Sequence, residues 1–120
     1  MIILDAHRKE GSDAGAHVMA YVMAPDRDTA RGIARAVLSQ RLAACANLAP
    51  IESLYWWKGQ IEESPEGLLI FKTRRELVGR LTAAVKAIHP CEIPCVVTYP
   101  MEEGFRPYLA WLDGETGGQR

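Results

Sequence analysis

The sequence SLYWWKGQIEESPEGLLIFKT, residues 53–73, determines how the rest of the chain must be arranged. It predicts two long strands joined at Lys58-Gly59, because glycine adopts turn conformations that strain other residues. Side chains alternate between the two faces of a strand, so Leu54 and Trp56 point to one face and their aromatic neighbours to the other. Both faces are apolar. One layer of helices covers one face, and we expect another copy of this chain to cover the second.

Length and composition exclude several classes of protein. A chain of 120 residues forms one domain, and 48% hydrophobic with 24% charged residues is typical of globular proteins. A formal net charge of -1 gives no electrostatic footprint for nucleic acid. Three cysteines, an odd number, favour a reducing compartment. The apolar start at residues 2–4 is too short for a signal peptide, and no run is long enough to span a membrane. We therefore expect a cytoplasmic protein.

The two ends of the chain differ from its centre. Residues 1–15 are polar and show no sustained periodicity, which predicts a flexible leader. Residues 114–120 are polar and rich in glycine, which predicts a disordered tail. The folded domain is expected over residues 16–113.

The first strand and first helix have clear local signals. Residues 17–24 alternate with apolar side chains on both faces, and Pro25 ends the strand. Asp26 is placed to cap the following helix. The helix has one apolar face, formed by Ala30, Ile33, Ala34, Val37 and Leu38.

The second and third strands flank the Lys58-Gly59 turn. The second begins at Leu42, and Pro50 predicts a break before the strand resumes. The third runs to Lys72, and Pro65 with Gly67 predicts a bulge within it.

The C-terminal half adds two helices and one strand. Thr73 and Glu76 have the spacing of a capping box, and the helix that they open must end near His89, before Pro90. Residues 95–99 predict the fourth strand, and residues 105–112 predict a short final helix. The resulting order, β-α-β-β-α-β plus a helix, is that of a ferredoxin-like α+β fold. Because the second sheet face is also apolar, we expect an obligate homo-oligomer.

The sequence contains no familiar catalytic motif, and its most unusual constellation is HPCEIPC, residues 89–95. Imidazole and thiolate groups are ligands that copper and zinc favour, so His89, Cys91 and Cys95 are candidate metal ligands. The alternative is a helix-ending histidine and two small buried cysteines. Cys45 is either a core residue or a thiol that faces a cleft between subunits. A redox pair of Cys91 and Cys95 is disfavoured, because no helix N-terminus lowers a thiol pKa there.

Several motifs in order resemble the CutA divalent-cation tolerance proteins over about residues 17–112. They are APDRDTA (24–30), RLAACAN (41–47), SLYWWKGQIEE (53–63), FKTR (71–74), HPCEIP (89–94) and YLAWL (108–112). The resemblance implies a ferredoxin-like fold, a tight trimer related in architecture to the PII signalling proteins, and a role in tolerance to copper and other divalent metals.

The resemblance also implies a copper site that this chain retains only in part. In some members of the family, copper is assigned to a cysteine on the first strand and to two adjacent histidines. Val22 stands at the cysteine position and Ile88 at the first histidine position, so only His89 remains. Cys91 stands where the family commonly has tyrosine, and Cys95 is an additional thiol. We hypothesise that these thiols replace the missing ligands.

These observations lead to a main functional hypothesis and two alternatives. The main one is a non-enzymatic homotrimer that binds copper or a similar divalent metal through His89, Cys91, Cys95 and Cys45, with no metal required for folding. The first alternative is a PII-like signalling module that holds an anionic small molecule in clefts between subunits, near Lys72, Arg74 and Tyr99. The second is a structural scaffold. We expect no nucleic-acid or membrane partner.

Overall fold

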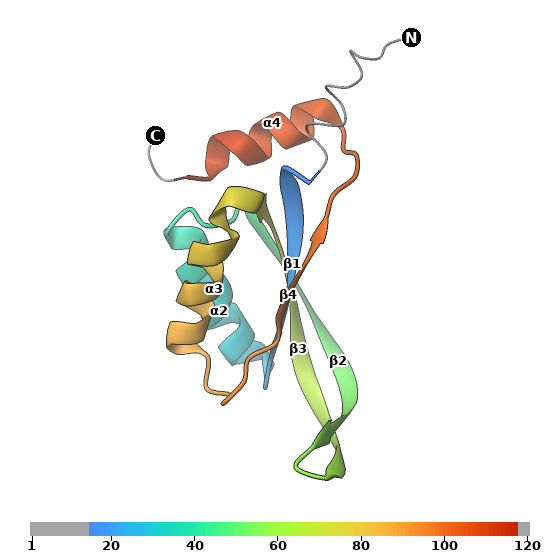
Figure 1. Ribbon diagram of the computed structural model, residues 1–120. Helices are drawn as coiled ribbons and strands as arrows, with labels where there is room; N and C mark the ends of the chain where they lie inside the picture. Colours follow the sequence, from blue (N-terminus) through green and yellow to red (C-terminus); the bar gives the residue numbers. More distant parts are fainter. Residues whose placement is uncertain (1–14, 118–120) are drawn as a thin grey trace.

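The computed structural model describes residues 15–117, and it shows helices packed on an antiparallel sheet (Figure 1). The elements are β1 (His17–Ala24), α2 (Arg27–Ser39), β2 (Cys45–Trp57), β3 (Gln60–Arg74), the 3-10 turn η1 (Arg75–Leu77), α3 (Val78–Ile88), β4 (Val96–Pro100) and α4 (Arg106–Glu115). The strand order in the four-stranded sheet is β2-β3-β1-β4. The predicted ferredoxin-like fold with an additional C-terminal helix is confirmed.

The core lies between the sheet and the pair of helices α2 and α3. Every second residue of β1 is buried, as the alternating pattern predicts. Val22 pairs with Leu69, and Ala20 pairs with Phe71, so β1 and β3 present one apolar face together. The helices complete this core with Ile33, Val37, Leu81 and Val85. Removing this apolar area from water supplies the main driving force for folding.

The helix α2 begins at the predicted cap. The Asp26 carboxylate accepts a hydrogen bond of 2.7 Å from the backbone N–H of Thr29. Hydrogen bonds from Thr29 hold the pKa of Asp26 below its usual value, because they favour the ionised carboxylate. A negative charge at this end also suits the helix dipole.

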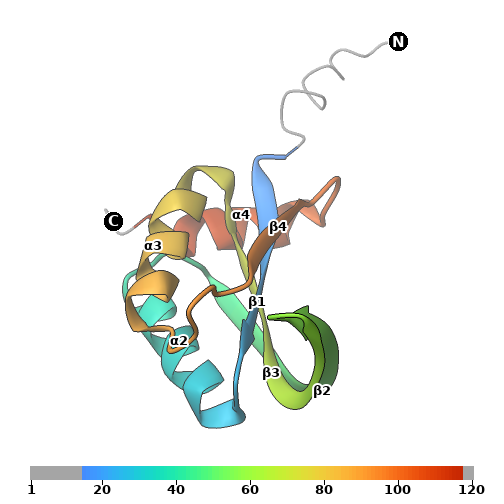
Figure 2. The same cartoon turned by 60° about the horizontal axis from the view of Figure 1, so that its bottom comes forward.

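The turn between β2 and β3 matches the prediction. Lys58 and Gly59 both have positive φ, at 50° and 82°. Two consecutive residues with positive φ form the tight turn whose twist fits a two-residue hairpin. The two strands then pair from Trp57 opposite Gln60 to Cys45 opposite Lys72. Beyond β1 the hairpin continues alone and curls, as Figure 2 shows.

The predicted break and bulge in this hairpin are wrong. The register between β2 and β3 is continuous, with Pro50 opposite Gly67 and Glu52 opposite Pro65. Hydrogen-bonded and non-hydrogen-bonded pairs alternate along an antiparallel ladder, so these two pairs, which lie two positions apart, are of the same kind. A proline fits where its missing N–H would have pointed away from the partner strand. Leu42 and Ala43, predicted to begin β2, instead precede it as buried residues.

The predicted capping box at Thr73 is also wrong. The Thr73 hydroxyl is fully buried and donates a 2.7 Å hydrogen bond to the carbonyl of Leu42. A 3-10 turn then leads into α3, which ends at Ile88 as Pro90 requires. This hydrogen bond joins the end of β3 to the segment before β2. It also satisfies the Leu42 carbonyl, which would lose free energy if it were buried without a partner.

The helix α4 is longer than the sequence predicted, and the predicted tail begins too early. Gly114 and Glu115 belong to α4, and Thr116 is buried, so a disordered segment over these residues is wrong. The Thr116 hydroxyl accepts a 2.9 Å hydrogen bond from Arg74 Nε, and the N–H of Gly117 donates to the carbonyl of Arg41. These partners are distant in sequence, so no local signal could reveal them. Residues 118–120 and the predicted leader, except Gly15, lie outside the described residues.

The helix α4 is fastened across one end of the sheet (Figure 1). His17 Nε2 at the start of β1 lies 2.8 Å from Asp113 Oδ1. Arg41 Nη1 lies 2.9 Å from Glu115 Oε1, which ties the same end of α4 to the loop before β2. The last turn of the helix therefore has two charged partners.

The second face of the sheet carries large exposed apolar side chains. Val97 and Tyr99 on β4 are 46% and 50% exposed, and Tyr55 on β2 is 43% exposed. Tyr21 on β1 packs edge-on against Tyr99, with ring centroids 6.3 Å apart. No helix in residues 15–117 has the length and apolar character needed to span a membrane. The apolar side chains on the second face agree with the sequence prediction.

Candidate functional site

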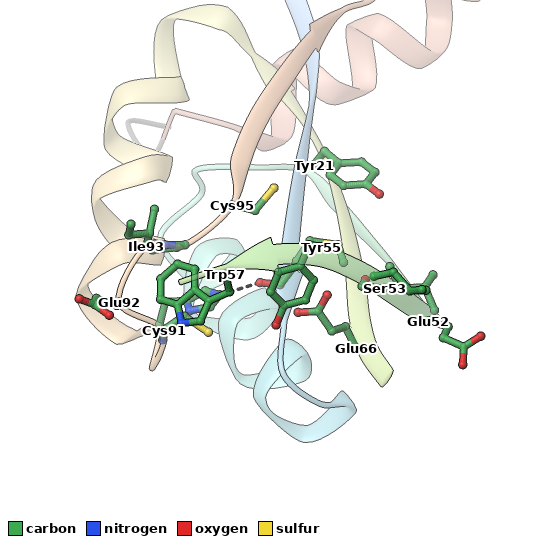
Figure 3. Close-up of a pocket in the computed structure, with 15 residues that line it drawn as sticks. Tyr21, Glu52, Ser53, Tyr55, Trp57, Glu66, Cys91, Glu92, Ile93 and Cys95 are labelled. Carbon is green, nitrogen blue, oxygen red and sulfur yellow. Dashed lines mark hydrogen bonds between the residues drawn. The ribbon is translucent and has the colours of Figure 1, made fainter. Parts of the chain in front are cut away.

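A groove of about 780 Å³ lies between the curled hairpin and the loop from α3 to β4 (Figure 3). The hairpin contributes Tyr55 and Trp57 from β2 and Glu66 from β3, and the loop contributes residue 89 and residues 91–95. The floor is formed by side chains from the exposed face of β1, Tyr21 and Met23. A space of this size is typical of sites for small molecules.

The loop that forms one wall is held in place by His89. Its Nδ1 accepts a 3.1 Å hydrogen bond from the backbone N–H of Cys91. The other nitrogen, Nε2, therefore carries the proton and donates to the carbonyl of Met23 at 2.6 Å. Both ring nitrogens are used inside the chain, so in this arrangement His89 has no free lone pair for a metal.

Two of the predicted cysteine ligands line the groove. Cys91 and Cys95 are exposed free thiols on the same wall. Burial raises the pKa of the Cys95 thiol, and the negative charge of Glu66 raises it further. Cys95 is therefore held in the thiol form, which is the weaker nucleophile and metal ligand.

The third predicted cysteine lies elsewhere. Cys45 is half-buried at the start of β2, opposite Lys72 on β3, and it does not line the groove. Within residues 15–117, no three His, Cys, Asp or Glu side chains are grouped so that they could hold a metal ion. The four predicted ligands are thus not assembled into one centre within a single copy of the chain.

The predicted anion-binding residues share the exposed face of the sheet. Lys72 and Tyr99 flank Met19 on either side, and Arg74 lies two residues further along β3. The Lys72 ammonium sits 5.9 Å from the ring centroid of Tyr108 on α4. Arg74 forms a salt bridge with Glu76. These side chains are close together, and each already has a partner in the chain.

The sequence did not identify the aromatic and acidic side of the groove. Tyr55 and Trp57 were interpreted only as strand residues, and Tyr21 and Met23 only as an apolar face. Alternation along β1 placed these last two on the correct face. Only the curl of the hairpin, which has no simple sequence signal, brings all of them to the 89–95 loop (Figure 2).

Known proteins resemble this chain over most of its length. The model of the family described as CutA1 divalent ion tolerance protein matches residues 18–115. The protein CutA of Mus musculus is 49% identical over 94 residues, which cover 78% of this chain and 53% of that protein. The chain thus spans about half the length of such mammalian relatives.

Solved structures agree with this similarity. The structure of CutA1 from Oryza sativa has a TM-score of 0.83 and 39% identity, and the match covers 86% of this chain and 95% of that one. A protein described as the periplasmic divalent cation tolerance protein CutA from Archaeoglobus fulgidus has a TM-score of 0.81 and 39% identity, covering 82% and 97%. The similarity therefore extends to the whole ferredoxin-like fold.

Proposed function

The chain belongs to the CutA1 divalent ion tolerance protein family, and from this membership we propose that it is a non-enzymatic homotrimer that binds copper or similar metal ions and serves in metal tolerance. The match to residues 18–115 is the observation that carries the proposal. The longer relatives include segments that this chain does not match, so the role of a whole relative is transferred here only as part of the proposal.

The sulfur atoms of the groove support a soft metal ion as the ligand. Cys91, Cys95 and Met23 all line it, and thiolate and thioether ligands favour Cu(I). His89 positions the loop that carries the thiols through its two hydrogen bonds. Binding would have to deprotonate the Cys95 thiol, whose pKa is raised, so copper affinity should increase with pH.

Copper titration of single variants tests this assignment. We expect Cys91→Ser and Cys95→Ser each to weaken Cu(I) binding about tenfold or more, because each removes a direct ligand. Cys45→Ser is the matched control, since Cys45 lies outside the groove, and it should leave the affinity within about twofold. Affinity should be measured by competition with a Cu(I)-specific chelator. Equal effects of all three variants, or none, would contradict a copper site in the groove.

The exposed sheet face supports assembly into a trimer. It presents Tyr99, Val97 and Tyr55, each about half exposed. Contiguous apolar area of this kind normally marks a protein interface. The three free thiols also support a reducing, cytoplasmic location.

One observation favours the PII-like alternative. Lys72 and Tyr99 flank Met19 in one row across the sheet, so a basic group and a hydroxyl face the same side. An anionic metabolite would have to displace the contact between Lys72 and Tyr108. A thermal-shift screen of anionic metabolites tests this, because a ligand of the folded state raises its stability. Stabilisation that is lost in Lys72→Met would favour this function over metal binding.

A further inference from the structure

We propose that α4 is a displaceable cover over a basic cradle, and that a multivalent phosphate anion binds the cradle when α4 is displaced. The basic cradle consists of four side chains that the C-terminal part of the chain contacts: His17, Arg41, Lys72 and Arg74. This inference rests on the anion-binding alternative described above. It adds two basic residues to that site and a means of controlling access to it.

The last turn of α4 places a carboxylate on each of two basic residues. Asp113 Oδ1 lies 2.8 Å from His17 Nε2 at the start of β1. Arg41 Nη1, in the loop after α2, donates to Glu115 Oε1 at 2.9 Å and to the Glu115 carbonyl at 3.2 Å. The helix therefore presents to these two side chains the kind of group that an anionic ligand would present.

The other two basic residues lie on β3 and also contact this part of the chain. Arg74 Nε donates a 2.9 Å hydrogen bond to the Thr116 hydroxyl, and the Lys72 ammonium lies 5.9 Å from the centroid of the Tyr108 ring. Lys72 and Arg74 are two positions apart and so share one face of the strand. α4 covers this end of the sheet within one copy (Figure 1), so the cradle is separate from the uncovered area assigned to contact with another copy.

The cradle carries an excess of positive charge once α4 is removed. Arg41, Lys72 and Arg74 supply three positive charges, and Glu76, which pairs with Arg74, supplies one negative charge. Like charges gathered at one place repel one another, so the open cradle favours an anion that carries several charges. Guanidinium groups bind phosphate oxygens in a bidentate manner, which favours phosphate as the chemical class.

The contacts that hold α4 are of a kind that can open without unfolding the domain. Within the helix only Leu112 is buried, and the side chains of Asp113 and Glu115 are 51% and 46% exposed. Exposed ion pairs contribute little to stability, and elements with few buried apolar side chains open locally at low cost in free energy. A ligand that binds only the open state then shifts the population toward it.

The backbone of Arg41 provides an independent observation at the same place. Its φ is 60°, in the left-handed region that glycine adopts with less strain than other residues. Its carbonyl accepts a hydrogen bond from the N–H of Gly117, and its guanidinium binds Glu115. These contacts offset the strain while α4 is docked, and a bound phosphate would take over the contact of the guanidinium when α4 is displaced.

Isothermal titration of the full chain with inorganic tripolyphosphate at low ionic strength tests the proposal. The double variant Asp113→Asn/Glu115→Gln keeps the side-chain shapes but removes the competing charges, and it should bind at least about tenfold more tightly than the parent chain. The matched control is Glu102→Gln/Glu103→Gln, which removes two charges from exposed residues in the loop before α4 and should stay within about twofold of the parent. Adding Lys72→Met to the first variant should abolish the gain.

Hydrogen exchange of the parent chain distinguishes displacement of α4 from binding elsewhere. Tripolyphosphate should speed exchange of the α4 amides and leave those of α3 unchanged. Binding that protects α4, or an equal gain in affinity in the Glu102→Gln/Glu103→Gln control, would overturn the cover while leaving the anion-binding function in place. Absence of binding to every variant would overturn both. Cu(I) affinity should be the same in Asp113→Asn/Glu115→Gln as in the parent, so the proposed metal function is tested separately.

Discussion

His89 and Cys95 have side chains whose chemistry is set by their neighbours in the fold. His89 resembles a metal ligand in sequence, yet its ring joins the 89–95 loop to the Met23 carbonyl on β1. Cys95 lies in the same loop and is held protonated by burial and by Glu66. The residue types alone would suggest two reactive groups, whereas the structure gives one anchor and one thiol whose pKa is raised.

The reactivity of Cys95 gives a prediction at this scale. In a Cys45→Ser/Cys91→Ser background, alkylation of Cys95 by iodoacetamide should follow a pH profile whose midpoint lies above that of a free cysteine, because only the thiolate reacts. Glu66→Gln should lower this midpoint and speed the reaction at pH 8, but not restore the free value, since burial is the larger cause. A midpoint at or below the free value would show that Cys95 is not shielded in this way.

Sequence reasoning at this scale succeeded only for residues that are neighbours in the chain. It placed His89, Cys91 and Cys95 on one loop, because Pro90 ends a helix at a known point. It could not show that Glu66 lies near Cys95, since 29 positions separate 66 from 95 and a curled hairpin brings them together. The effect of one charged side chain on the pKa of another that is distant in sequence leaves no local sequence pattern.

The β2–β3 hairpin is the element that departs furthest from a flat sheet. Its tight turn uses positive φ at both Lys58 and Gly59. An added Cβ at Gly59 would meet no atom within 4 Å, so only backbone strain opposes a larger residue there. Gly32 in the middle of α2 also has open space around it, but its φ is not positive. Because neither site has a packing obstacle to a Cβ, a difference between substitutions at these two glycines reports backbone conformation alone.

Alanine substitutions at these two positions should have opposite effects on stability. Gly59→Ala should lower the free energy of unfolding by roughly 1–2 kcal/mol, because alanine is strained at positive φ. Gly32→Ala should raise it by roughly 0.5–1 kcal/mol, because alanine is the better helix former. Both values can be measured by guanidinium denaturation at one protein concentration. If both substitutions changed the free energy of unfolding in the same direction, positive φ would not be the reason for a glycine at position 59.

At the scale of elements, strong local signals predicted the fold well. Asp26, Lys58-Gly59 and Pro90 each mark a boundary that the structure confirms. The predictions from Pro50 and Pro65 were wrong, because a proline is compatible with an antiparallel ladder at every second position. Whether a residue occupies a hydrogen-bonded or a non-hydrogen-bonded position depends on the register of the strands, which composition does not reveal.

The molecule as a whole has one covered and one largely uncovered sheet face. The covered face packs Val22 and its neighbours against α2 and α3. On the other face, α4 covers the end where β1 begins, and Val97, opposite Tyr21, remains 46% exposed. This asymmetry was predictable from the sequence, because both alternating sets of side chains along β1 are apolar and the helices of one chain can cover only one of them.

The exposed face predicts a specific effect on assembly. Multi-angle light scattering of the parent chain at micromolar concentration should give the mass of a trimer, about three times 13.3 kDa. Val97→Lys should shift the mass toward the monomer, because it places a charge in the apolar face. Arg35→Glu, on the exposed side of α2, should not. A soluble, folded monomer for the parent chain would refute the proposed assembly.

The unbroken pairing of β2 with β3 also predicts the order in which the chain folds. Its first pair joins residues 57 and 60, whereas β1 reaches β4 by joining residues 18 and 100. Closing a short loop loses less chain entropy than closing a long one, so the hairpin should zip from its turn before β4 docks. Pulse-labelling hydrogen exchange should find amides near residues 55–62 protected earlier than those of 96–100. Leu54 and Trp56 would then be displayed on a nascent hairpin while the core is still open, and refolding should compete with aggregation as the chain concentration rises.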